Sequence, residues 1–189
     1  MSDDLVTGDD GLPRCRWGAS TPDYVRYHDD EWGRPVHGAD ALYEKLCLEA
    51  FQSGFSWLTI LRKRENFRRA FAGFEIAAVA RFGDDDVARL MADTGIVRNR
   101  ANIEAAIANA RAAAAVDDLS ALIWSHAPDP AGRPAPRMLA DVPPLTPAST
   151  ALAKALKQRG FRFVGPTTTY ALMQACGLVN DHLEGCCAR

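Results

Sequence analysis

Two pairs of cysteine and histidine, one near each end of the chain, have the composition of a single metal site. Cys15 and His28 lie near the N-terminus, whereas His182 and Cys186 lie near the C-terminus. Two thiolates and two imidazoles form a ligand set that Zn²⁺ takes in closed tetrahedral structural sites. Helical spacing would place His182 and Cys186 one turn apart on one face. The alternative is structural, because cysteine is often a small buried hydrophobic residue and a single histidine is often a core residue.

Aromatic residues and one acid suggest a pocket for a flat, positively charged ligand. Tyr24, Tyr27, Trp32 and Trp57 are the rings, and Glu49 is an acid on an otherwise apolar helix face. A base flipped out of DNA needs rings to stack on and an acceptor for its edge. Aromatic faces attract a cationic base more strongly than a neutral one. Core packing accounts for most aromatic residues, however, and Glu49 could equally turn to solvent.

The segment 90–101 is a candidate phosphate-binding element. Its two predicted helices meet at a short turn around Gly95, as in a helix-hairpin-helix. In that motif, backbone N–H groups of the hairpin and of the next helix bind a DNA phosphate without reading sequence. Arg98 and Arg100 would add positive charge there. Val97 replaces the usual second glycine, and a plain connection between two helices is equally compatible with these residues.

Two basic clusters could track a duplex backbone, although such clusters are usually solvated helix faces. The clusters are Arg62, Lys63, Arg64, Arg68 and Arg69, and Lys154, Lys157, Arg159 and Arg162.

The composition indicates an ordinary globular protein rather than a membrane or secreted one. The 189 residues are 48% hydrophobic and 24% charged, with a net charge of −2. This suffices for one domain with a real core, and whole-protein charge alone points to no class of partner. Five cysteines and the lack of a signal-like segment argue against a disulfide framework. Apolar stretches are too short for a membrane span. We therefore expect a cytoplasmic protein.

The hydrophobic pattern predicts an all-α domain over residues 14–189 and an acidic, mobile tail over residues 1–13. Residues 128–147 are rich in proline and should be an irregular connection, and only residues 161–164 look strand-like. Asp40 and Asp84 or Asp85 are expected to cap helices. The predicted helical segments are 40–51, a stretch from 57 with an apolar face continuing to 74, 84–91, 99–115, 149–158 and 167–176.

Several blocks of this sequence are similar to the constitutive bacterial 3-methyladenine DNA glycosylase I family. The similarity runs from about residue 14 to residue 187, nearly the whole chain. The blocks that carry it are residues 15–17, 27–33, 47–49, 54–57, 63–66, 155–165 and 173–182.

The resemblance implies a helix-hairpin-helix glycosylase-like fold in which one zinc ion joins the N- and C-terminal regions. The zinc ligands would be Cys15, His28, His182 and Cys186, and the zinc would be structural because no coordination position stays open. The helix-hairpin-helix would lie near residues 84–115.

The resemblance also implies roles for the pocket and its rim. Glu49 would be the catalytic, base-contacting acid, and Tyr24, Tyr27 and Trp57 would form the base pocket. Gly54 and Phe55 would form the wedge into the DNA stack, where relatives carry leucine in place of Phe55. DNA-backbone contacts would come from Gly95, Arg98 and Arg100.

The implied activity is excision of N3-methyladenine from alkylated double-stranded DNA. The enzyme would hydrolyse the N-glycosidic bond, act as a monomer and leave an abasic site. The family lacks the usual catalytic Asp of hairpin glycosylases, so we assign no general base, and no lysine is expected to form a Schiff base. An alternative is a zinc-stapled protein that binds or senses damaged DNA without glycosylase activity. A third is a helical interaction domain that binds no nucleic acid.

Overall fold

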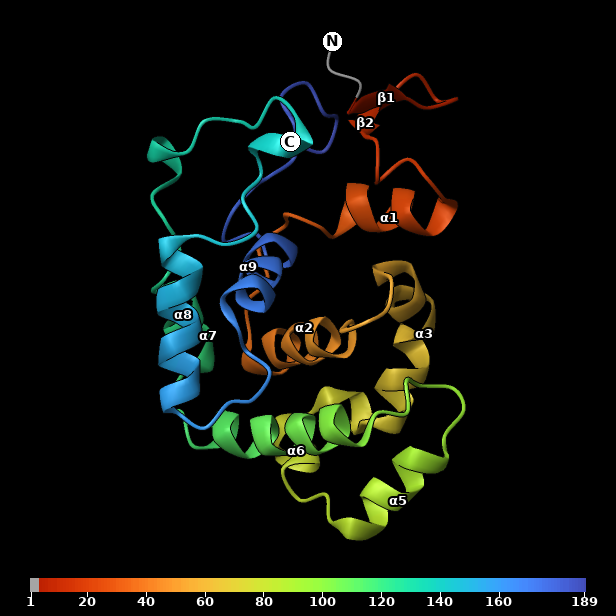
Figure 1. Ribbon diagram of the computed structural model, residues 1–189, viewed down its shortest axis with the longest axis vertical. Helices are drawn as coiled ribbons and strands as arrows, with labels where there is room; N and C mark the ends of the chain where they lie inside the picture. Colours follow the sequence, from red (N-terminus) through yellow and green to blue (C-terminus); the bar gives the residue numbers. More distant parts are fainter. Residues whose placement is uncertain (1–3) are drawn as a thin grey trace.

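The computed structural model describes residues 4–189, and Asp3, part of the expected acidic tail, lies outside them. The described part is mainly helical, as predicted, with one short antiparallel hairpin (Figure 1). In chain order the elements are β1 (Leu5–Thr7), β2 (Pro13–Cys15), α1 (Pro22–Asp30), α2 (Ala39–Phe51), α3 (Trp57–Ala70), η1 (Ala72–Phe74), α4 (Ile76–Val79), α5 (Asp84–Ala92), α6 (Arg100–Ala114), α7 (Leu119–Trp124), η2 (Pro130–Gly132), η3 (Leu139–Asp141), α8 (Pro147–Gln158) and α9 (Pro166–Ala175).

Helix α2 is the centre of the fold, and α3, α6, α7 and α9 pack around it (Figure 1). Its sequence is apolar on most sides, which is typical of a helix that is buried all round. Leu42, Leu46, Leu48 and Phe51 are completely buried, and the hydroxyl of Tyr43 donates a hydrogen bond to a carbonyl of α6. Because α2 is held on all sides, Glu49 near its C-terminal end is carried on a rigid element.

The segment expected to be a mobile tail differs from that expectation over its described part. Leu5–Thr7 pairs with Pro13–Cys15, with Leu5 opposite Cys15. Arg14, which is buried, forms salt bridges with Asp10 and Asp29 and so fixes the hairpin to the end of α1. The strand-like segment 161–164 forms no strand. The sequence pattern missed these strands because each is only three residues long.

Most predicted helices are present, with small changes at their N-termini. Asn99 caps α6, whereas α8 begins earlier than expected, after Thr146. Gly38 rather than Asp40 precedes α2, and the Asp40 carboxylate instead accepts a hydrogen bond from the backbone N–H of Ile76. The sequence pattern did not predict α1 or α7.

The N- and C-terminal segments lie side by side at one end of the molecule (Figure 1). The backbone N–H of Cys187 donates to the carbonyl of Pro13 at 2.8 Å. Gly177 ends α9 with a φ of +73°, and a Cβ there would lie 2.5 Å from the backbone of Arg34. This close approach locks the end of α9 onto the segment that follows α1. Across residues 4–189, no helix is long and apolar enough to cross a membrane.

Candidate functional site

A cavity of about 290 Å³ lies between the first helices and α9. The structure brings together in its wall the predicted pocket residues Tyr24, Tyr27, Glu49 and Trp57. The complete lining is Trp17, Tyr24, Tyr27, Trp32, Glu49, Gln52, Trp57, Ala171 and Gln174.

Aromatic rings form much of the cavity wall and hold each other in place. The rings of Tyr27 and Trp57 lie 5.4 Å apart and are tilted by 48°, so they are not stacked on one another. Trp17 packs edge-on against Tyr24 and Trp32, with centroid distances of 5.7 and 5.0 Å. The hydroxyl of Tyr24 accepts a hydrogen bond from the backbone N–H of Leu58, which ties α1 to the start of α3. The rings are therefore fixed before any ligand binds.

Glu49 is an acid without a counter-ion in this wall. The residue is only 8% exposed, and its carboxyl makes no hydrogen bond or ion pair within residues 4–189. Burial raises the pKa of its carboxyl to about 8, although Lys45 one turn earlier acts in the opposite direction. Burying a carboxyl without a partner costs stability, and such groups are concentrated at functional sites. The alternative that Glu49 turns to solvent is wrong.

The charged side chains near Glu49 pair with one another: Arg64 and Lys45 both bind Glu31, and neither forms an ion pair with Glu49. Glu31 accepts hydrogen bonds from Arg64 at 2.6 and 2.8 Å and from Lys45 at 3.2 Å. Burial opposes ionisation of Glu31, but Arg64 and Lys45 lower its pKa to about 2. The Lys45 ammonium also lies 5.5 Å from the centroid of the Tyr27 ring.

The four predicted metal ligands form one buried cluster beside the cavity. One ligand atom from each of Cys15, His28, His182 and Cys186 lies within 4.8 Å of the others. The Nε2 atom of His28 is 3.2 Å from Nδ1 of His182 and 3.4 Å from Sγ of Cys186. Nδ1 of His182 and Sγ of Cys186 are 3.6 Å apart. Tetrahedral zinc would space two nitrogens by about 3.3 Å, and a nitrogen and a sulfur by about 3.6 Å. The residues present therefore fit a four-coordinate metal ion.

In both imidazoles, the ring nitrogen that faces away from the cluster already has a hydrogen-bond partner, as is typical of metal-binding histidines. Nδ1 of His28 lies 2.7 Å from the Asp29 carboxylate, and Nε2 of His182 lies 2.9 Å from the carbonyl of Trp32. The hydrogen bond that Cys15 and Cys186 share lowers the pKa of the Cys186 thiol, with His182 and His28 acting in the same direction, and raises the pKa of the Cys15 thiol.

The expected helical spacing of the C-terminal pair is wrong. Residues 180–189 form turns rather than a helix, so His182 and Cys186 approach the cluster from irregular backbone. A Cβ at Gly18 would lie 2.4 Å from the His28 ring, so only glycine fits there.

The cluster also supports the cavity, because two residues belong to both regions. Trp17 lines the cavity and packs edge-on against His28, and Trp32 lines the cavity while its carbonyl faces His182.

Comparisons of the sequence and the structure with known proteins all match methyladenine glycosylases. The family model described as methyladenine glycosylase matches residues 17–189. The chain belongs to the methyladenine glycosylase family. It is 46% identical over 180 residues to DNA-3-methyladenine glycosylase 1 of Escherichia coli (strain K12), covering 93% of this chain and 96% of the relative.

Solved structures agree with this assignment over most of the chain. A crystal structure of 3-methyladenine DNA glycosylase I has a TM-score of 0.87 and 46% identity, covering 93% of this chain and 99% of the other. A variant of 3-methyladenine DNA glycosylase I in complex with 3-methyladenine has a TM-score of 0.85 and 35% identity, covering 93% and 96% of the two chains.

In this methyladenine glycosylase, Phe55 lies in the connection between α2 and α3, between the cavity-lining residues Gln52 and Trp57. Phe55 is 48% exposed, and Gly54 before it has a φ of +82°. Phe55 is therefore a surface residue rather than part of the core.

The connection between α5 and α6 is tightly held by polar contacts. The N–H of Gly95 donates to the Asp93 carboxylate at 2.7 Å, and the carbonyl of Gly95 accepts from Lys63 and Asn66. Val97 is buried in the core, which explains an apolar residue where the usual hairpin has a second glycine.

The two arginines predicted to contact DNA at the α5–α6 connection differ in their own contacts. Arg98 is exposed, and Arg100 forms a 3.5 Å ion pair with Glu104. Because the Gly95 N–H is satisfied internally, a phosphate at this connection would have to bind the amides that follow it.

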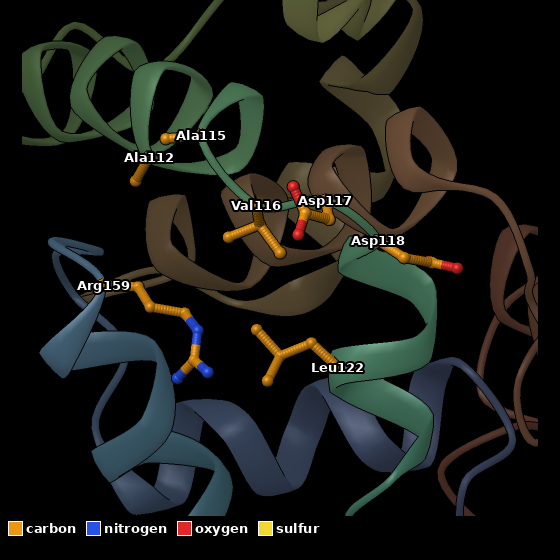
Figure 2. A pocket seen from close by; sticks show the side chains of 7 residues that line it. All are labelled: Ala112, Ala115, Val116, Asp117, Asp118, Leu122 and Arg159. Atoms are coloured by element: carbon orange, nitrogen blue, oxygen red, sulfur yellow. The ribbon is translucent and has the colours of Figure 1, made fainter.

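A second hollow, of about 460 Å³, lies away from these residues (Figure 2). Asp117 and Asp118 line one side of it, at the end of α6 and the start of α7, and Arg159 at the end of α8 lies opposite. It contains no aromatic ring and none of the predicted base-pocket or metal residues, so it does not compete as a base-binding site.

Sequence reasoning missed Trp17, Gln52, Ala171 and Gln174 as cavity residues. Trp17 lies in a block that carried the family resemblance, so a signal for it existed. Gln174 also lies in such a block, but nothing in its residue type distinguishes it from a surface glutamine.

Proposed function

We propose that this chain is a DNA repair glycosylase that excises N3-methyladenine from alkylated duplex DNA and leaves an abasic site. The observation that carries the proposal is the unpartnered Glu49 carboxyl in an aromatic-walled cavity. A cavity of this kind suits a flat cation better than a neutral base. Relatives named for this activity, and a neighbour in complex with 3-methyladenine, support the same substrate.

The substrate needs little help to react, which matches the few charged groups in the cavity wall. Methylation at N3 makes adenine cationic, so the bond to deoxyribose is weak and the base departs neutral without a general acid. Glu49 accepts a hydrogen bond from the exocyclic amino group and complements the positive charge. Tyr27 and Trp57 stack on the base, and Tyr24 completes the pocket. Water attacks C1′ of the sugar during or after departure, and no lysine forms a covalent intermediate.

We infer that the metal cluster holds one structural zinc ion through Cys15, His28, His182 and Cys186. The ligand types and spacings support zinc, and four protein ligands leave no position at which the ion would activate water. The zinc supplies cross-linking between distant segments, and the chain's own Trp17 and Trp32 transmit that rigidity to the cavity.

The DNA-binding surface in this proposal extends from Phe55 to the α5–α6 connection. Phe55 fills the gap left by the flipped nucleotide, and this insertion costs the free energy of unstacking the neighbouring bases. The connection acts as a helix-hairpin-helix, in which Gly95 makes the turn while Arg98 and Arg100 supply charge to a phosphate. We propose a monomer that acts on duplex DNA in the cytoplasm.

Arg98→Ala is expected to weaken binding to all DNA sequences alike and to reduce the salt dependence of binding by roughly one unit of slope. The reason is that one fewer phosphate is neutralised, so one fewer counterion is released. The measurement is log Kd against log salt for two unrelated duplexes. Arg81→Ala is the matched control, because Arg81 is also exposed but precedes the opposite end of α5. A loss confined to one DNA sequence, or an equal loss in the control, would contradict the phosphate role.

The proposed activity is tested by incubating the protein with methylated duplex DNA and identifying the released bases by chromatography. We expect free 3-methyladenine and no 7-methylguanine, together with alkali-sensitive abasic sites in the DNA. A folded protein that binds DNA with an abasic-site analogue but releases no base would instead be the damage-sensing protein considered as the alternative. A protein that neither binds nor releases would support an interaction domain.

A further inference from the structure

The side chain of Gln174 on α9 is fixed at both its amide nitrogen and its backbone. Its Nε2 atom donates to Oδ2 of Asp181 at 2.9 Å. Its backbone carbonyl accepts from the N–H of Gly33 at 3.0 Å, in the segment that follows α1. Gln174 lines the cavity, whereas Asp181 does not.

Asp181 determines which end of the Gln174 amide faces it. The aspartate is 4% exposed and also accepts hydrogen bonds from the hydroxyl of Tyr170 at 2.5 Å and from Arg133 at 2.9 Å. Three donors converge on this carboxyl, so the amide nitrogen of Gln174, rather than its oxygen, faces it. The amide oxygen is then the opposite end.

The Oε1 atom of Gln174 has no partner within residues 4–189, and it is not among the fully buried unpaired atoms. It is therefore accessible to solvent, on a residue that lines the cavity. Glu49 contributes the other unpaired acceptor to the same wall, from α2 rather than α9.

We propose that Gln174 is a specificity-determining residue that accepts a hydrogen bond from the base and selects purines with a 6-amino group over purines with a 6-oxo group. This inference rests on the proposed function. The adenine amino group has two N–H bonds, of which Glu49 accepts one and Gln174 the other. In the N3-methylated cation the positive charge spreads onto this amino group, which strengthens both hydrogen bonds.

A neutral, fixed acceptor discriminates where a carboxyl alone would not. Glu49 can take up a proton, because its pKa lies at about 8, and a protonated carboxyl can donate to a 6-oxo oxygen. The Gln174 amide does not titrate, and Asp181 prevents it from turning its nitrogen into the cavity. A 6-oxo purine therefore brings oxygen against oxygen at Gln174, and sites with buried fixed acceptors reject such ligands strongly.

The test is Gln174→Met, which keeps the side-chain length but removes the acceptor. Single-turnover release of 3-methyladenine and of 3-methylguanine is measured on the same methylated DNA. We expect release of 3-methyladenine to fall roughly 10- to 100-fold, as for loss of one hydrogen bond to a charged group, while release of 3-methylguanine stays constant or rises. An equal fall for both bases, or no change in either, would overturn the inference.

A binding measurement separates failure of this inference from failure of the proposed function. Three of the four tryptophans of the chain line the cavity, so free 3-methyladenine and its 6-oxo analogue 3-methylhypoxanthine can be titrated by intrinsic fluorescence. The wild type should prefer the amino compound, and Gln174→Met should lose most of that preference. If the wild type releases no base from DNA, the proposed function fails, yet the titration still decides the role of Gln174.

Two further variants guard against a simple folding defect. Asp181→Asn allows the Gln174 amide to turn over, because the new amide can donate as well as accept. We expect this variant to shift preference toward the 6-oxo compound, and an unchanged preference at full metal content would count against the inference. Gln158→Met, at an exposed position at the end of α8, is the matched control and should keep the wild-type preference.

Discussion

Replacing Glu49 by glutamine is expected to lower kcat/KM for excision of N3-methyladenine by about 100- to 1000-fold. Binding to DNA that contains an abasic-site analogue should stay at the wild-type level. The reason is that Glu49 complements a charge that exists only when the alkylated base occupies the cavity, whereas the DNA backbone contacts other residues. Unchanged excision by Glu49→Gln would remove Glu49 from the mechanism.

The pH dependence of kcat/KM in the wild type is a second test of the role of Glu49. Burial raises the pKa of Glu49 to about 8, so below that pH the free enzyme holds a neutral acid that cannot complement a cation. We expect kcat/KM to rise about tenfold per pH unit on the acid side and to level off above pH 8. The Glu49→Gln profile should be flat over this range, and a flat wild-type profile would contradict the assignment.

The stability of Glu49→Gln should change in the opposite direction to its activity. The folded-state pKa of Glu49 lies above the unfolded value of 4.5, so ionisation costs stability progressively as pH rises from 4.5 to about 8. Glutamine removes this cost, and the variant should melt at a higher temperature than the wild type at pH 8. Higher Tm with lower kcat/KM would exclude unfolding as the cause of lost activity.

Removing the metal is expected to lower Tm by about 8–16 °C. A ligand present at about 1,000 times its Kd stabilises a protein by about 4 kcal/mol, and each kcal/mol shifts Tm by about 2–4 °C in a chain of this size. Cys186→Ser should melt like the chelated wild type and contain no zinc by elemental analysis. At temperatures where it stays folded it should still release 3-methyladenine, because the ion is not catalytic.

Cys187→Ser is the matched control for this experiment. Cys187 is adjacent to Cys186 but exposed, and it lies outside the four-residue cluster. It should keep one zinc per chain and the wild-type Tm. If Cys186→Ser keeps its metal, or if chelation leaves the wild-type Tm unchanged, the cluster does not act as a structural metal site.

Residue types predicted the metal cluster and the acid better than they predicted the geometry around them. Cys15 and His182 could be paired from their chemistry, because few other arrangements use two thiols and two imidazoles. The helical spacing expected of His182 and Cys186 was wrong, because a separation of four residues is compatible with turns as well as helices. Trp57 was predicted as a pocket residue, but its contact with Tyr27 depends on how α1 packs on α3.

The features that sequence could not predict depend on contacts between distant segments. Gln174 has an oriented amide only because Asp181 is buried with Arg133 and Tyr170, and no local pattern encodes that arrangement. The hairpin of β1 and β2 likewise depends on the salt bridges of Arg14 with Asp10 and Asp29. Helices with strong periodicity, such as α6, needed no such information.

The separation of the metal ligands along the chain has a consequence for the order of folding. Cys15 and His28 belong to one end of the sequence and His182 and Cys186 to the other, so the four meet only after a very long loop has closed. Closing such a loop is entropically costly and slow unless intervening contacts have already formed. We therefore expect the central helices around α2 to assemble first, so that the proposed zinc ion would be captured late, by a chain already close to its final shape. Uptake of the proposed zinc ion would accordingly report completion of the last step of folding and would not start folding.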